Sequence, residues 1–175
     1  MIELLNSLTK KLSEEANNIA EFITSGNKYK STIFKNSYKF NSLETRPSQI
    51  RGKAGVYVFI FEQPISFDND EVRKWNSITG AGFKNYESKE FNKGDCLYVG
   101  SGDSIFSRMM AHFSPDGEST GLHLSNPKRS KALNCVIVYS FPLKDEYQPY
   151  ASIIAREVEK KLHNILSPAA GSSRV

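Results

Sequence analysis

Residues 54–62 read AGVYVFIFE and residues 96–100 read CLYVG, and these two stretches decide the fold. The first is a nearly unbroken run of β-branched and aromatic residues, which is typical of a strand buried on both faces. The second is short and apolar, and the Ser, Gly and Asp that follow it favour a turn. We expect both stretches to be strands of one sheet, joined by the long connection 63–95.

The rest of the chain supplies helices and one further strand. Apolar residues three or four positions apart predict amphipathic helices over 2–23, 104–113 and 150–166, and a short helix over 71–77. Another apolar run, residues 133–141, predicts a third strand. This order predicts an α+β fold, in which a small, mostly antiparallel three-stranded sheet is flanked by helices and preceded by an N-terminal helix.

Length and composition narrow the class of protein. The 175 residues suffice for a domain with a buried core, and we place a boundary between an N-terminal helix and basic arm, residues 1–53, and a main domain, residues 54–175. No apolar run approaches the roughly 18 residues of a membrane helix, and no secretion signal is evident, so we expect a cytoplasmic protein without a membrane partner. The two cysteines show no spacing typical of a metal site or a disulfide framework.

Positive charge is concentrated in one segment. The net charge is +4, and residues 26–53 hold seven basic residues against one acid. Four aromatic residues are interleaved with them, so Lys35 and Lys39 could neutralise nucleic-acid phosphates while the rings stack or anchor the arm. A solvated connection whose aromatic rings pack into the core is an equal alternative.

A second basic cluster consists of Lys128, Arg129 and Lys131. Such a cluster near an active face could hold a phosphate backbone, and a plain solvated charge run is at least as common. For the N-terminal helix we favour packing on the core over formation of a homodimer.

Two of the predicted helices carry polar residues at the border of their apolar faces. Arg108 and His112 lie four residues apart on the predicted helix over 104–113. On the last helix, Glu159 lies about 40° around the axis from Ala155, at the edge of the buried stripe, whereas Glu157 falls on the polar face. A carboxylate at such an edge needs a partner, and a metal ion is one candidate. A surface Arg, a hydrogen-bonded His and a Glu paired with a Lys are the structural alternatives.

The order and spacing of these elements resemble the GIY-YIG nuclease family. The resemblance covers residues 54–168 and rests on Gly-Val-Tyr, then Tyr-Val-Gly, an Arg ten residues after the second Tyr, a His one helical turn later and a Glu nine residues before a Pro. It implies that Tyr57 is the general base and that Tyr98 is its hydrogen-bonding partner or an alternative base. It also implies that Arg108 and His112 are catalytic and that Glu159 binds Mg²⁺ or Mn²⁺.

The same resemblance implies a function. We expect a DNA endonuclease that hydrolyses one strand per active site, as a stand-alone restriction-like or DNA-processing enzyme, with RNA left open as a substrate. A catalytically inactive DNA-binding module on the same fold and an interaction protein are the rival hypotheses. Two features depart from the family: the long connection 63–95, and Pro168, which is followed by Ala-Ala-Gly-Ser-Ser where the family often has Asn. A Ser could replace that Asn, or the role could be absent.

Overall fold

The computed structural model describes residues 2–40, 48–116 and 121–171 and has an α+β architecture with an N-terminal helix. Its main sheet has four strands in the order β1-β6-β2-β5, and every pairing is antiparallel. The strands are Tyr38–Phe40 (β1), Gly55–Phe61 (β2), Cys96–Gly102 (β5) and Val136–Pro142 (β6). The expected sheet had three strands. The fourth, β1, belongs to the basic arm, so part of that arm is built into the sheet.

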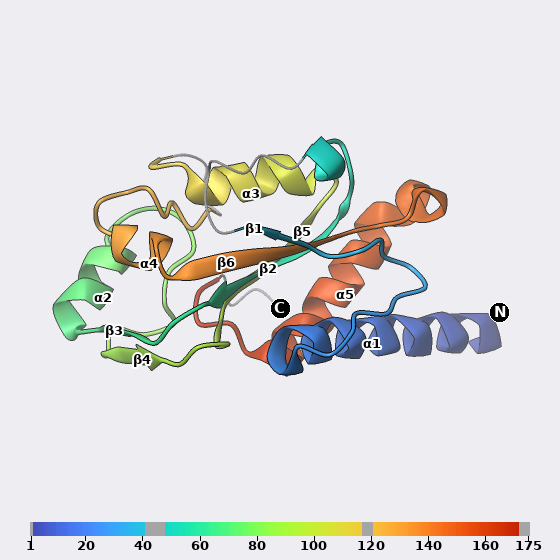
Figure 1. Ribbon diagram of the computed structural model, residues 1–175, viewed down its shortest axis with the longest axis horizontal. Helices are drawn as coiled ribbons and strands as arrows, with labels where there is room; N and C mark the ends of the chain where they lie inside the picture. Colours follow the sequence, from blue (N-terminus) through green and yellow to red (C-terminus); the bar gives the residue numbers. More distant parts are fainter. Residues whose placement is uncertain (1, 41–47, 117–120, 172–175) are drawn as a thin grey trace.

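Helices cover both faces of this sheet (Figure 1). They are Ile105–Phe113 (α3) on one face, and Ile2–Ser25 (α1) and Ala151–Leu166 (α5) on the other. Strand β2 lies between the two layers and all of its side chains are buried, as its unbroken apolar sequence predicts. Tyr57, Phe59 and Phe61 pack in the core beside α3, whereas the residues between them pack in the core beside α1 and α5.

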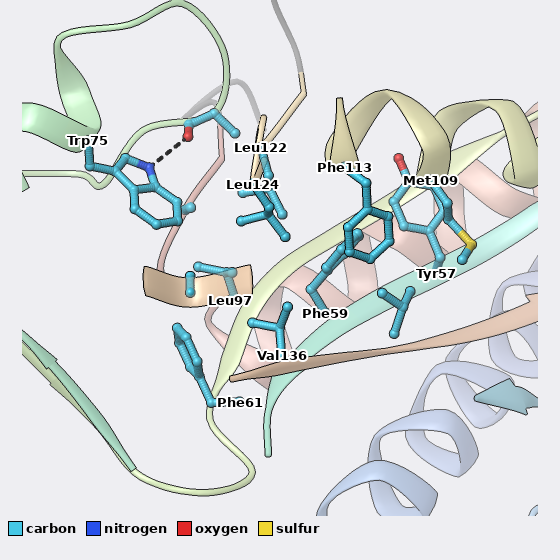
Figure 2. Packing of buried hydrophobic residues seen from close by; sticks show 14 of the residues in the cluster. Tyr57, Phe59, Phe61, Trp75, Leu97, Met109, Phe113, Leu122, Leu124 and Val136 are labelled. Atoms are coloured by element: carbon cyan, nitrogen blue, oxygen red, sulfur yellow. Dashed lines mark hydrogen bonds between the residues drawn. The ribbon is translucent and has the colours of Figure 1, made fainter. Parts of the chain in front are cut away.

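The connection between β2 and β5 is a structured insertion at one end of the main sheet (Figure 1). It contains Ile65–Phe67 (β3), Asn69–Asn76 (α2) and Lys89–Phe91 (β4), and β3 pairs with β4 in a separate two-stranded sheet. Trp75, which ends the buried face of α2, is completely buried. Figure 2 shows its indole N–H donating to the carbonyl oxygen of Ala81, at 3.1 Å. The large aromatic side chain thus fixes the insertion to the core.

The remaining described elements are short. They are Ser48–Ile50 (η1) and Asp145–Tyr150 (η2), which are 3₁₀ helices, and Ser130–Leu133 (α4). Among the described helices, none combines the length and the hydropathy that a membrane span requires.

The aromatic residues of the basic arm pack inward. Phe34 and Phe40 are buried, and the ring of Tyr29 lies on that of Phe141 with 5.1 Å between the centroids. The carboxylate of Glu15 on α1 accepts hydrogen bonds from the hydroxyl groups of residues 31 and 32 and so ties the arm to the helix. Of the two alternatives for this segment, the structure favours the one in which the aromatic rings pack into the core.

Candidate active site

The site is built around the end of β5, where successive residues face opposite sides of the sheet. Gly100 is paired with Tyr57 of β2, and a Cβ atom at Gly100 would collide with the Tyr57 hydroxyl. A Cβ atom at Gly102 would lie 2.8 Å from Cγ of Arg108. These two glycines therefore leave room for the phenol and the guanidinium on the α3 face, while Ser101 between them faces α5. The expected turn begins after Gly102, because the strand continues through this residue.

Tyr57 and His112 form the buried half of the site. Tyr57 is 0% exposed and His112 is 1% exposed, and Figure 2 shows Tyr57 beside α3, near Met109 and Phe113. The Tyr57 hydroxyl lies 2.9 Å from Nε2 of His112, and Nδ1 of His112 accepts a hydrogen bond from the backbone N–H of Leu122, also at 2.9 Å. The proton of the neutral imidazole must then lie on Nε2, which donates to the Tyr57 oxygen.

The protonation state of His112 follows from its surroundings. Burial, the positive charge of Arg108 and the neighbouring His123 lower the pKa of His112 to about 3. At neutral pH the ring is therefore uncharged, and both of its nitrogens have hydrogen-bond partners. Such an imidazole orients the Tyr57 phenol. To orient a catalytic water or to pass a proton, His112 would have to leave this arrangement.

The other half of the site consists of Tyr98, Arg108 and Glu159, and we call it the exposed half. Each of these three side chains is partly exposed to solvent. The Tyr98 ring is stacked on that of Tyr57, with 6.3 Å between the centroids and 17° between the planes. Burial and the charge of Glu159 raise the pKa of Tyr98 to about 12, and the charge of Arg108 opposes them. The phenol of Tyr98 is thus protonated at neutral pH unless further positive charge is added.

The buried phenol responds to the same charges. Burial raises the pKa of Tyr57 well above its usual value, and Tyr98 and Glu159 act in the same direction. Arg108 opposes the increase through its charge and through a hydrogen bond with the phenol. One guanidinium and one carboxylate therefore act on both tyrosines, although the four side chains come from β2, β5, α3 and α5.

Two residues that the sequence analysis missed lie beside Glu159. The hydroxyl of Ser101 donates to Oε2 of Glu159 at 2.5 Å. Nε2 of His163, one helical turn further along α5, lies 3.8 Å from Oε1 of Glu159 and 3.3 Å from the carbonyl oxygen of Val99. The signals were present, since Ser101 lies between two glycines and His163 is four residues after Glu159. Their meaning depends on α5 lying along β5, which the sequence pattern did not reveal.

The donor set fits magnesium better than zinc. Within residues 2–40, 48–116 and 121–171, no three His, Cys, Asp or Glu side chains are grouped so that they could hold a metal ion. Zinc sites in proteins need three or four such ligands. Mg²⁺ commonly retains several waters and takes one or two carboxylates together with substrate phosphates. Glu159, with 27% of its side chain exposed, can serve as that carboxylate.

Four of the five residues expected to contact nucleic acid lie at the surface, and each has a partner there. Lys35 pairs with Asp145, Lys39 with Glu62 and Lys131 with Glu71, and Lys128 donates to the hydroxyl of Ser77. Exposed contacts of this kind are weak, so phosphates could replace the present partners.

The expectation that Arg129 contacts nucleic acid as part of the second basic cluster is wrong. Its side chain is 0% exposed, and its guanidinium donates to the backbone carbonyl oxygens of Trp75, Ile78 and Leu122. These carbonyls compensate the burial of the charge. Arg129 therefore joins the insertion to the segment after α3 and is not available to a nucleic acid.

The segment after Pro168 runs beside β5. The backbone N–H groups of Ala169 and Ala170 donate to the carbonyl oxygens of Cys96 and Leu97. Ser172 and Ser173, the candidates to replace the family's Asn, lie outside the described residues. Comparisons of this chain with protein-family models, with curated proteins and with solved structures give no match.

Proposed function

We propose that this chain is a metal-dependent DNA endonuclease of the GIY-YIG type, which hydrolyses one strand per active site and acts as a stand-alone restriction-like or DNA-processing enzyme. One observation carries the proposal. Arg108 and Glu159, from different helices, both act on the Tyr57 and Tyr98 phenols at the end of β5. A phosphodiesterase needs a cationic donor, a carboxylate for a metal ion and a proton acceptor, and this cluster contains all three.

In this mechanism the exposed half meets the substrate. The guanidinium of Arg108 binds oxygens of the scissile phosphate, because it is permanently charged and presents several N–H donors in one plane. The Tyr98 phenolate accepts a proton from the attacking water, whose oxygen forms a bond to phosphorus as the bond to the leaving oxygen breaks. The leaving oxygen takes its proton from solvent.

The buried half supports this chemistry. His112 donates to the Tyr57 oxygen and fixes the ring in place, and Tyr57 fixes Tyr98 by stacking on it. The Ser101 hydroxyl holds the carboxylate of Glu159, which would bind Mg²⁺ or Mn²⁺, and His163 lies beside it. When bound, the cation would supply positive charge to the phosphate and lower the pKa of the water.

A plasmid assay tests the proposal. Supercoiled DNA incubated with the protein and Mg²⁺ or Mn²⁺ should be nicked, and EDTA should prevent nicking. Glu159→Gln removes the negative charge while keeping the shape of the side chain, and it should slow nicking by about 10³-fold. Glu157→Gln is the matched control, because Glu157 pairs with Lys160 on the outer face of α5. Equal rates for the two variants would remove Glu159 from the mechanism.

A DNA-binding module without turnover is the second candidate. The raised pKa values of both phenols favour it, since neither tyrosine is a base at neutral pH without further positive charge. Such a module would bind DNA with a steep dependence on salt and would not nick plasmid with either metal ion.

A further inference from the structure

A second basic site lies in the N-terminal arm, away from the phenol cluster. A groove of about 560 Å³ is lined there by Lys30, Lys35, Lys144, two tyrosines, Phe34, Ser31 and Asn36. Its lining includes three ammonium groups and no carboxylate. We propose that this groove binds a backbone phosphate of the DNA strand whose scissile phosphate lies at the candidate active site. This inference rests on the proposed function.

The lysines retain donors for such a phosphate. Lys30 has no hydrogen bond or ion pair with any residue in the described ranges. The ammonium of Lys144 donates one hydrogen bond to the carbonyl oxygen of Thr32. The ammonium of Lys35 forms an ion pair with Asp145, whose side chain is 67% exposed. An ammonium has three N–H donors, and an exposed ion pair is weak, so all three lysines can turn towards an anion.

Tyr29 provides a neutral donor in the same groove. Its hydroxyl is shielded from solvent and lies beside the hydroxyl of Ser31. The nearby Ser31 hydroxyl is already engaged, since it donates to Glu15 and accepts from the N–H groups of residues 33 and 34. Burial raises the pKa of Tyr29, so its O–H keeps its proton, and it can donate to a phosphate oxygen once the anion displaces the side chains that now shield it.

The sheet sets the position of the groove relative to the phenols. Tyr38, which lines the groove, is paired with Ser140, and Ser140 is paired with Tyr57. Directly paired residues point to the same face, and Tyr57 is paired with Gly100 of β5, the strand that carries Tyr98. Neighbouring strands are about 4.8 Å apart, so about 14 Å separates Tyr38 from β5 across the sheet. Duplex DNA advances about 3.4 Å per nucleotide of each strand. A strand cut beside Tyr98 can therefore reach the groove with a phosphate about four or more nucleotides away.

The test is the salt dependence of DNA binding in EDTA, where metal-dependent cleavage does not occur. The double variant Lys30→Gln/Lys144→Gln should bind a fluorescent DNA duplex more weakly, with a slope of log K against log salt that is shallower by about 1, because one phosphate contact is lost. The matched control is Lys10→Gln/Lys93→Gln, two exposed lysines outside the groove, and its slope should change by less than about 0.5. Tyr29→Phe should weaken binding several-fold and leave the slope unchanged.

Three outcomes overturn the inference, and they are distinguishable from one another. Equal loss of slope in both double variants would mean that only overall charge matters. An unchanged slope in Lys30→Gln/Lys144→Gln, with plasmid nicking intact in the parent protein, would remove the groove and leave the proposed function standing. No DNA binding and no nicking by the parent protein would remove both.

Discussion

The two tyrosines of the site stack on each other from adjacent strands, yet they have different surroundings. Tyr57 is on β2, which has a partner strand on each side, and it is 0% exposed. Tyr98 is on β5, the edge strand of the sheet, and it is only partly buried. A residue on an edge strand can meet a substrate, whereas its neighbour on a central strand is enclosed by the layers around it. For this reason the mechanism that we propose gives contact with the substrate to Tyr98 and a supporting role to Tyr57.

Among the substitutions that test this difference, loss of Arg108 should lower the rate of nicking most, because Arg108 belongs to the exposed half and acts on both phenols. Arg108→Ala should lower the rate of nicking by about 10²–10³-fold, the usual cost of losing one donor to a developing charge. Arg108→Lys should restore part of the rate, since it keeps the charge without the planar fork. Single-turnover nicking is the measurement, with Arg156→Ala on the exposed face of α5 as the control.

Tyr98→Phe should lower the rate by about 10²-fold, as expected when a general base is removed. The free energy of unfolding should change by less than about 0.5 kcal/mol, because the hydroxyl is at a partly exposed site. Both quantities can be measured on one preparation, by plasmid nicking and by urea denaturation. A rate like that of the parent protein would show that Tyr98 is not the base.

His112 should make stability depend on pH. Its pKa is about 3 in the folded state and about 6.5 in the unfolded chain, so only the unfolded chain takes up a proton between these values. The stability contributed by neutral His112 is therefore fully present above pH 6.5 and falls by about 1.4 kcal/mol per unit as the pH drops towards 3. Urea denaturation at several pH values should show this slope in the parent protein and a shallower slope, by that amount, in His112→Gln.

Tyr57→Phe should have the smallest effect on rate and a measurable effect on stability. The variant leaves the Nε2–H of His112 without its acceptor in the interior, which costs about 1–3 kcal/mol. Nicking per folded molecule should fall by less than about tenfold, since this phenol does not contact the substrate. Thermal denaturation together with nicking at a temperature where the variant is folded would check both expectations. A large loss of rate in a fully folded variant would reverse the roles of the two tyrosines.

Much of the fold could be predicted from periodicity. The helices over 104–113 and 150–166 and the strand over 54–62 are found within a residue of their expected bounds. Strand β1 was missed, because three residues of a polar arm carry too little hydrophobic pattern and the pairing with β6 is a long-range contact. Likewise, the pairing of β3 with β4 in the insertion depends on contacts between residues more than twenty positions apart.

The sequence predicted which residues lie together in the site better than it predicted which of them are buried. The structure brings Tyr57, Tyr98, Arg108, His112 and Glu159 together, as the resemblance implied, and their catalytic roles stay predictions. The sequence gives similar tripeptides to a central and an edge strand, so it could not tell which phenol is enclosed. Arg129 was misplaced for a related reason: a basic residue in a polar run looks solvated until the carbonyl groups that receive it are known.

The pH dependence of nicking tests the division between the two phenols most directly. Because Tyr98 must lose a proton from a pKa of about 12, the single-turnover rate of the parent protein should rise about tenfold per unit between about pH 6 and 9. Tyr57→Phe should show the same rise, and Tyr98→Phe should show none. A rise that persists in Tyr98→Phe and disappears in Tyr57→Phe would contradict the account, because the base would then be the tyrosine enclosed within the sheet.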